Sequence, residues 1–322
     1  MGRILTVLLA SLFAAGASAA DPAASYPNRP VRLITGSPGS TSDIAARFVA
    51  QKLAERWGQQ VVVDNRPGAG GIIGAEIAAR AAPDGYTLMV GQIGTHASAQ
   101  FLFKKLAYDP VKDFLPITLM TNSGIALAVN PSVPAKDLKS FVEYAKAKPG
   151  SVNYGSAGGG TSSQLSGELF NQMTGARLVH IPYKGAGPAL TALIAGETQA
   201  AFLSTTTISA QAKAGKVRPL AVLSEKRFPA APDIPSAGEA GFAGLDSSVW
   251  FGLFAPAKTP KPIVVKVNRD VVEILRSPDA KAALLKQGAE AVPTTPEEFG
   301  AFLKKEIAKW SKVIKEAGIK AN

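Results

Sequence analysis

The sequence contains no cysteine, which excludes disulfide bonds, a lipid-modified N-terminus and every metal site built on thiolates. It has only two histidines, so HExxH and Cys/His zinc motifs are absent. The GxSxG motif of α/β-hydrolases is also missing. Beyond the N-terminus, no apolar run approaches the length of a transmembrane helix. These absences argue against a metalloenzyme and a membrane-inserted chain; a Ser-His-Asp triad assembled from dispersed loops stays open, with no spacing that supports it.

Acidic residues are fewer than basic ones, and the formal net charge is +11. The basic residues are scattered in runs no longer than pairs such as Lys104-Lys105 and Lys304-Lys305, without interleaved aromatics. Nucleic-acid binding is therefore not expected. The charge indicates either a diffuse field that favours small anions or simply a basic surface.

The N-terminus predicts export. Arg3 precedes an apolar stretch over residues 4–15, and Ala17-Ser18-Ala19 forms a small-x-small cleavage site. This stretch is too short to span a bilayer, so we interpret residues 1–19 as a signal peptide cleaved near Ala19. A structural N-terminal helix is the alternative. An exported chain without a lipid anchor points to the periplasm.

The remaining chain alternates β-branched runs with helical patterns, which predicts an α/β fold with mostly parallel sheets. Two such series and a returning strand suggest two lobes, lobe I over 20–123 and 249–322 and lobe II over 124–248. We expect the chain to cross between them near 122–125 and 247–249. The expected strands are 31–35, 61–65, 86–90, 125–129, 152–154, 178–181, 200–203, 218–223 and 249–254. The expected helices are 43–58 and 74–82, and others beginning near 135, 161, 187 and 207.

The last third predicts mainly helix. Helix starts are expected at 277–279 and 295–298, the second with capping-box spacing. Phe299, Phe302, Trp310 and Ile314 then recur near helical spacing. We expect this stripe to dock on a domain as core.

Two loops rich in Gly and Ser follow expected strands and precede expected helices. Such junctions offer free backbone N–H groups, hydroxyls and a helix N-terminus, which suit a carboxylate or phosphate. The first loop offers Ser37, Gly39, Ser40, Thr41, Ser42 and Asp43; a tight turn capped by Ser42 or Asp43 is its alternative. The second offers Ser156, Gly158, Gly160, Thr161 and Ser163. If the loops face each other from two lobes, a small molecule with one or two carboxylates would fit between them.

A third Gly-rich junction, residues 66–74, superficially matches a dinucleotide fingerprint. It follows the second strand, and the next strand ends without an acidic ribose partner, so we interpret it as a turn and expect no cofactor. Of the two histidines, His180 lies in an apolar strand and is expected in the core. His96 follows a Gly-containing turn and is the better candidate for a cleft.

These motifs together resemble the Bug-type solute receptors, the extracytoplasmic binding proteins of tripartite tricarboxylate transporters. The resemblance covers essentially the whole mature chain. Its most distinctive stretches are VDNRPGAGGIIG (63–74), APDGYTL (82–88), NYGSAG (153–158) and IPYKG (181–185).

The resemblance implies a type II periplasmic-binding-protein fold, with two α/β lobes around a ligand cleft, and a monomer that catalyses nothing. The implied partners are a small organic acid and the membrane subunits of a tripartite tricarboxylate-type transporter; a role in sensing is the alternative. Besides the two loops, the resemblance implies ligand contacts at Thr95, His96, Tyr183, Lys184, Gly185, Ser204 and Thr205.

The chain departs from the family pattern at three positions. Ser40 stands where a second Gly is usual, Gln164 where His is frequent, and Ala192 where Asp is common. Ala192 either alters the pocket, favouring acids without an α-amino group, or packs between helix and sheet.

Overall fold

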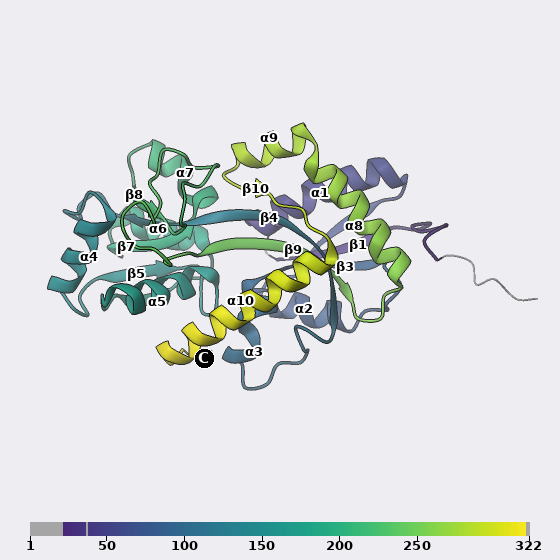
Figure 1. The fold of residues 1–322 in the computed structure, drawn as a ribbon, viewed down its shortest axis with the longest axis horizontal. Coiled ribbons are helices and arrows are strands. Elements are labelled where there is room, and N and C mark those ends of the chain that lie inside the picture. The colour runs from purple at the N-terminus through teal and green to yellow at the C-terminus, as the bar shows by residue number, and fades with distance from the viewer. Residues whose placement is uncertain (1–21, 37, 320–322) are drawn as a thin grey trace, which may run out of the picture.

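The structure is a computed structural model that describes residues 22–36 and 38–319. The expected signal peptide, residues 1–19, and Ser37 lie outside these ranges. The described chain forms one mixed α/β sheet of ten strands in the order β2-β1-β3-β9-β4-β7-β5-β6, with β8 and β10 also paired to β4 (Figure 1). The predicted α/β class is confirmed.

The first part of the sheet is built from βα units. Strand β1 pairs in parallel with both β2 and β3. The bounds of this part are β1 (Val31–Thr35), α1 (Thr41–Trp57), β2 (Val61–Asn65), η1 (Ala69–Gly71), α2 (Ile72–Ala79), β3 (Thr87–Gln92), the π-helical turn η2 (Ile93–Ser98) and α3 (Ala99–Leu102). Helix α1 ends at Gly58, whose φ of 63° gives it the left-handed conformation that closes a helix.

The second part repeats this arrangement, with β5 parallel to both β6 and β7. Its bounds are α4 (Leu138–Ala147), β5 (Asn153–Ser156), α5 (Ser162–Thr174), β6 (Val179–Pro182), α6 (Ala186–Ala195), β7 (Ala200–Ser204), α7 (Thr205–Lys213) and β8 (Arg218–Val222). Helix α4 begins three residues later than the sequence predicts because Asp137 accepts the backbone N–H of Ser140 and caps it there, at 2.7 Å.

Two long strands join the parts. Strand β4 (Phe114–Val129) pairs with β9 (Ser248–Pro256) as far as Gly124 and pairs with β7 and β8 from Ile125 onward. The change of partner lies within the expected crossing at 122–125. The lobe boundaries themselves stay a prediction. The first half of β4, residues 114–124, was not expected as strand.

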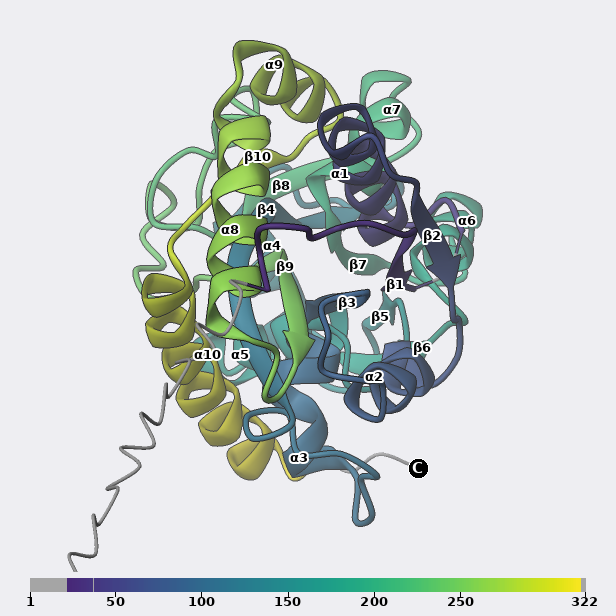
Figure 2. The same cartoon turned by 90° about the vertical axis from the view of Figure 1, so that its right-hand side faces the viewer.

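The C-terminal third adds α8 (Lys261–Arg276), α9 (Pro278–Lys286), β10 (Glu290–Ala291) and α10 (Pro296–Ala317). Both predicted helix starts are confirmed: Ser277 caps α9, and Thr295 forms a capping box with Glu298. Helices α1, α8 and α9 lie on one face of the sheet, and α2, α3 and α10 lie on the other (Figures 1 and 2).

Helix α10 packs on both parts of the sheet. Its stripe is core as predicted, with Phe299, Trp310 and Ile314 buried and Phe302 half-buried. The same apolar cluster includes Leu169 and Phe170 of α5. Gln172 Nε2 of α5 also donates to the carbonyl of Val313, at 3.0 Å.

Candidate functional site

The candidate loops all follow the carboxyl ends of parallel strands. In the first part they follow β1 and β3, and in the second part β5, β6 and β7. Parallel strands place their carboxyl ends at one edge of a sheet, where ligands of α/β proteins bind. Each part therefore gathers its loops at one edge.

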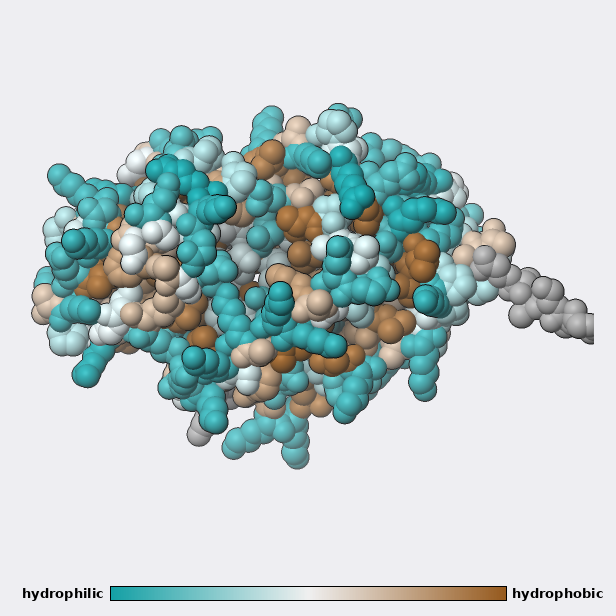
Figure 3. All heavy atoms as spheres, in the orientation of Figure 1, coloured by the Kyte–Doolittle hydropathy of each residue, from teal (hydrophilic) through white to brown (hydrophobic). Residues whose placement is uncertain are grey.

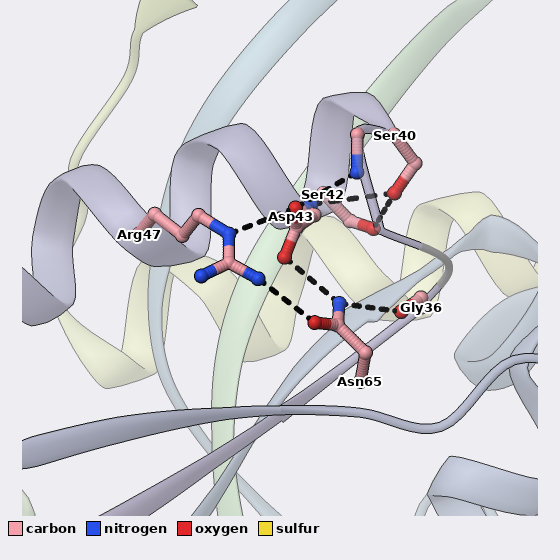
Figure 4. A network of polar contacts seen from close by, with 7 residues as sticks. Gly36, Ser40, Ser42, Asp43, Arg47 and Asn65 are labelled. Carbon is pink, nitrogen blue, oxygen red and sulfur yellow. Dashed lines mark hydrogen bonds and ion pairs between the residues drawn. The ribbon is translucent and has the colours of Figure 1, made fainter.

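The first loop is held together by the carboxylate of Asp43 (Figure 4). It accepts hydrogen bonds from the Gly39 backbone N–H at 2.8 Å, from Asn65 Nδ2 at 2.8 Å and from Arg47 Nε at 3.0 Å. Burial opposes its ionisation, but the hydrogen bonds from Arg47, Asn65 and Gly39 outweigh it and hold the pKa of Asp43 below its usual range. Its side chain is 4% exposed, so Asp43 shapes the loop from inside.

The serine hydroxyls of this loop lie at the N-terminus of α1. Ser40 caps the helix by accepting the backbone N–H of Asp43, at 3.3 Å, and its Oγ lies 2.9 Å from Ser42 Oγ. Asn65 Nδ2 also donates to the carbonyl of Gly36, at 2.9 Å, and fixes the end of β1. Thr41 is the first residue of α1. The loop is therefore a capped turn, but its cap is Ser40 and not Ser42 or Asp43 as expected; its role as a donor set stays a prediction.

In the second loop, Ser156 forms a hydrogen bond with His180, the histidine expected in the core. Ser156 Oγ lies 2.6 Å from His180 Nε2 and accepts the backbone N–H of Gly158, at 3.1 Å. The His180 ring lies 5.1 Å from the Tyr154 ring, and burial lowers its pKa to about 4. His180 is only half-buried because β6 is the last strand of the sheet, so this expectation was wrong. The hydrogen bond between His180 and Ser156 therefore fixes this part of the loop.

The rest of the second loop is pinned by its own side chains. Gly160 N–H donates to Gln164 Oε1 at 2.7 Å, and Thr161 Oγ1 donates to the Gly158 carbonyl at 2.8 Å. Ser163 is buried, and its hydroxyl donates to the carbonyl of Phe202. Gln164, which stands where the family often has His, thus holds the backbone of the loop.

The turn after β3 meets the second loop. Ser98 Oγ of η2 donates to the carbonyl of Gly160 at 3.0 Å, and both residues are buried. Gly160 has a φ of 74°, the left-handed conformation that favours glycine, and a Cβ there would also lie 2.6 Å from Leu102 Cδ1 of α3. Loops from the two parts of the sheet therefore lie against each other here. Within residues 22–36 and 38–319, no hydrogen bond joins the first loop to the second directly.

His96 lies in the core, which corrects the expectation that its side chain faces a cleft. Its ring is fully buried, stacks on Phe254 at a centroid distance of 3.8 Å and meets Phe114 edge-on at 4.6 Å. Nδ1 lies 2.9 Å from Thr95 Oγ1, and burial lowers the pKa of His96 to about 3. Thr95 is also buried, and its hydroxyl accepts the Gln92 backbone N–H at 3.0 Å. The π-helical turn η2 points both side chains inward.

Residues 181–185, the IPYKG segment, contact the second loop and include the cationic side chain of Lys184. The Tyr183 backbone N–H donates to the Ser156 carbonyl at 3.0 Å, and Gly185, with a φ of 122°, precedes α6. The Lys184 side chain is exposed, and in the described part of the chain it has no ion pair or hydrogen bond. Ala192, on α6, is 3% exposed, which favours the packing interpretation of that position.

The loop after β7 connects the two parts of the sheet. Ser204 caps α7 by accepting the Thr207 backbone N–H at 3.2 Å. Thr205 Oγ1 donates to the Gly288 carbonyl at 2.9 Å, and Thr206 Oγ1 lies 3.2 Å from Ser123 Oγ of β4. Both Ser204 and Thr205 are buried. These residues hold the two parts together near the change of partner in β4.

The polar groups of these loops are mainly uncharged hydrogen-bonding groups, namely backbone N–H groups and hydroxyls. The carboxylate of Asp43 is matched by Arg47, and Lys184 contributes a cation at the surface. No cluster of three or more His, Asp or Glu that could hold a metal ion occurs in the described ranges. No helix of residues 22–36 and 38–319 is long and apolar enough to cross a membrane. Backbone N–H groups and hydroxyls can receive a carboxylate without a full counter-charge.

Comparison with known proteins places this arrangement in a family. The sequence profile of the tripartite tricarboxylate transporter family receptor matches residues 45–319. BugT of Bordetella pertussis is 34% identical over 322 residues, 99% of each chain. The structure of Rpa4515 of R. palustris with adipate has a TM-score of 0.86 at 35% identity, covering 92% of this chain and 99% of that one. MatC from Rhodopseudomonas palustris with bound malate has a TM-score of 0.81 at 36% identity, covering 90% and 100%. The chain belongs to the family of tripartite tricarboxylate transporter receptors, and its fold is theirs.

Proposed function

We propose that this chain is a periplasmic receptor that captures a small organic carboxylate between the loops 36–43 and 155–163. The observation that carries the proposal is the meeting of the β3 turn with the second loop, through Ser98 and Gly160. It joins the carboxyl end of β3 to the second loop, and the loop 36–43 follows β1, the parallel neighbour of β3. The relatives crystallised with adipate and with malate support a dicarboxylate as the ligand class.

Capture proceeds by closure of two lobes, lobe I over 20–123 and 249–322 and lobe II over 124–248. One lobe receives the anion, the other completes its shell, and the closed form is recognised by the membrane subunits of a tripartite tricarboxylate-type transporter. The receptor works as a monomer after removal of a signal peptide near Ala19. Delivery to a sensor protein in place of a transporter is the alternative for the closed form.

Ser156 and His180 favour a second candidate, a hydrolase, because a 2.6 Å contact is that of a nucleophile and its base. Two observations support the receptor instead. Ser156 is 0% exposed, and within residues 22–36 and 38–319 no carboxylate is hydrogen-bonded to His180. We therefore propose that the chain catalyses nothing and releases its ligand unchanged.

Calorimetry tests this function. The protein, unfolded and refolded to remove any carried ligand, is titrated with malate, adipate, succinate and aromatic monocarboxylates, and the product mixture is analysed by mass spectrometry. We expect one acid to bind, to raise the unfolding temperature by mass action and to return intact. Small-angle scattering of the same samples should show a lower radius of gyration with ligand. Absence of binding by the whole panel, or chemical conversion of the bound acid, would overturn the proposal.

A further inference from the structure

The exposed face of α10 carries a row of lysines. Between residues 304 and 315 this face presents Lys304, Lys305, Lys312 and Lys315. The acid within the stretch, Glu306, is turned inward, where its Oε2 accepts the indole N–H groups of Trp250 at 2.8 Å and of Trp310 at 2.9 Å. Among the exposed residues from 304 to 316, the acid is Glu316, which lies next to Lys315 and four residues after Lys312. The four lysines therefore leave an excess of three positive charges on this face.

The charge of this row is not neutralised by neighbours. Within residues 22–36 and 38–319, no ion pair or hydrogen bond involves the side chains of the four lysines. Lys309, the remaining lysine of the stretch, differs because its Nζ donates to the Asp246 carbonyl at 2.6 Å and lies 4.9 Å above the Trp310 ring. At 1.5 Å per residue, the row from 304 to 315 is about 16 Å long.

The helix that carries the row is fixed in place. Its inner face buries Phe299, Leu303, Trp310, Val313 and Ile314, and it packs on both parts of the sheet. Helix α10 crosses the front of the molecule uncovered in Figure 1, and hydrophilic side chains project over the same region in Figure 3. The backbone positions of the four exposed lysines are therefore held in a constant spacing.

We propose that this row, Lys304, Lys305, Lys312 and Lys315, adsorbs the protein onto an anionic lipid surface. A protein partner of comparable affinity needs buried aromatic or aliphatic anchors at the centre of its interface. The other exposed residues from 301 to 315 are Ala301 and Ala308, which offer none. A membrane with anionic headgroups needs only accessible positive charge, and each lysine at its surface contributes about fivefold to the partition coefficient.

The row lies outside the candidate ligand loops, so adsorption is independent of the bound acid. Adsorption would concentrate the protein at the membrane whether or not it is a receptor. Faster delivery of ligand to a transporter would follow only if the proposed function is correct. Because exposed charges are screened within about 10 Å at 0.1 M salt, adsorption weakens steeply as salt rises.

Vesicle co-sedimentation tests the proposal, with vesicles of phosphatidylglycerol and phosphatidylcholine and a reference of phosphatidylcholine alone. Three proteins are compared: the wild type, the α10 variant and a variant that removes the same charge from the α4 region. The α10 variant carries Lys304→Gln, Lys305→Gln, Lys312→Gln and Lys315→Gln. The control carries Lys136→Gln, Lys139→Gln, Lys146→Gln and Lys148→Gln, all at exposed positions.

We expect the wild type and the α4 variant to bind the anionic vesicles comparably and the α10 variant to bind at least about thirtyfold more weakly, as if two lysines touch the surface at once. Unchanged circular dichroism and thermal unfolding establish that each variant is folded. Equal losses in the two variants would show that only net charge matters and would overturn the proposal. It would equally fail if the wild type did not bind the anionic vesicles, and an acidic protein would then be the better partner for the row.

Discussion

Substitution of Glu306 tests how strongly α10 is attached to the sheet. One carboxylate oxygen accepts two indole N–H groups, from Trp250 on β9 and from Trp310 on α10 itself. Both tryptophans are 0% exposed. In Glu306→Ala, both N–H groups lose their acceptor in the protein, while the apolar packing of the rings is retained.

The expected cost follows from the two donors. An unsatisfied buried donor costs about 1–3 kcal/mol, so Glu306→Ala should lower the free energy of unfolding by about 2–6 kcal/mol. In Glu306→Gln the amide oxygen can still accept, but two charge-assisted bonds become neutral ones. Each should lose about 1 kcal/mol, giving about 2 kcal/mol in total. The expected order of stability is therefore wild type, then Gln, then Ala.

Urea unfolding followed by tryptophan fluorescence measures this order directly, because Trp250 and Trp310 are two of the three tryptophans in the sequence. Far-UV circular dichroism serves as a second probe. The control is Glu316→Ala, at an exposed position of the same helix, which should change stability by less than about 0.5 kcal/mol. If Glu306→Ala were as stable as this control, the two indole bonds would contribute nothing, and the reasoning would be refuted.

Three further predictions concern the loops. The pKa of His96 falls from 6.5 to about 3 on burial, so its contribution to stability is present above pH 6.5 and declines by about 1.4 kcal/mol per unit as the pH falls toward 3. In His96→Phe, the decline in unfolding free energy between pH 6.5 and 5 should be about 2 kcal/mol smaller; equal declines would contradict this. Gly158 has a φ of 126°, and a Cβ there would lie 3.3 Å from the Tyr183 carbonyl. Gly158→Val should therefore abolish the binding of malate or adipate measured by calorimetry, while circular dichroism and cooperative melting are retained. Retained micromolar affinity would show that the loop is not part of the site. His180→Phe should weaken that binding about tenfold because it removes the hydrogen-bond partner of Ser156, and His180→Gln should restore most of it. Equal affinities of the two variants would rule out this positioning role.

The alternation of strands and helices could be predicted because each βα unit carries its own pattern. Most expected strands end within two residues of the observed ones. The first half of β4 could not be predicted, since Pro116 is unusual in a central strand. The structure accommodates it where the register with β9 shifts, between Pro116 and Thr118. That pairing joins residues far apart in the sequence, and local patterns carry no signal for it.

The loops could be predicted, but the direction of their side chains could not. His96 is buried because the turn after β3 is π-helical, and a shift of one residue in a turn decides which side chain points inward. His180 lies at the edge of the sheet because β6 is the last strand, and strand order is a property of the whole fold.

The electrostatics of the candidate site suit reversible capture. A buried Arg–carboxylate pair would bind an anion strongly, but breaking such a pair costs several kcal/mol and slows release. Here the first loop contains a carboxylate whose charge is matched by Arg47, so the loop as a whole offers an incoming anion dipoles and no net counter-charge. The second loop contains neutral groups, and neutral His180 fixes its shape. Lys184 adds attraction from the exposed surface, where solvent screens it. A site of this kind holds its ligand through many weak, directional hydrogen bonds that opening of the lobes would break together, as a receptor that must hand over its cargo requires.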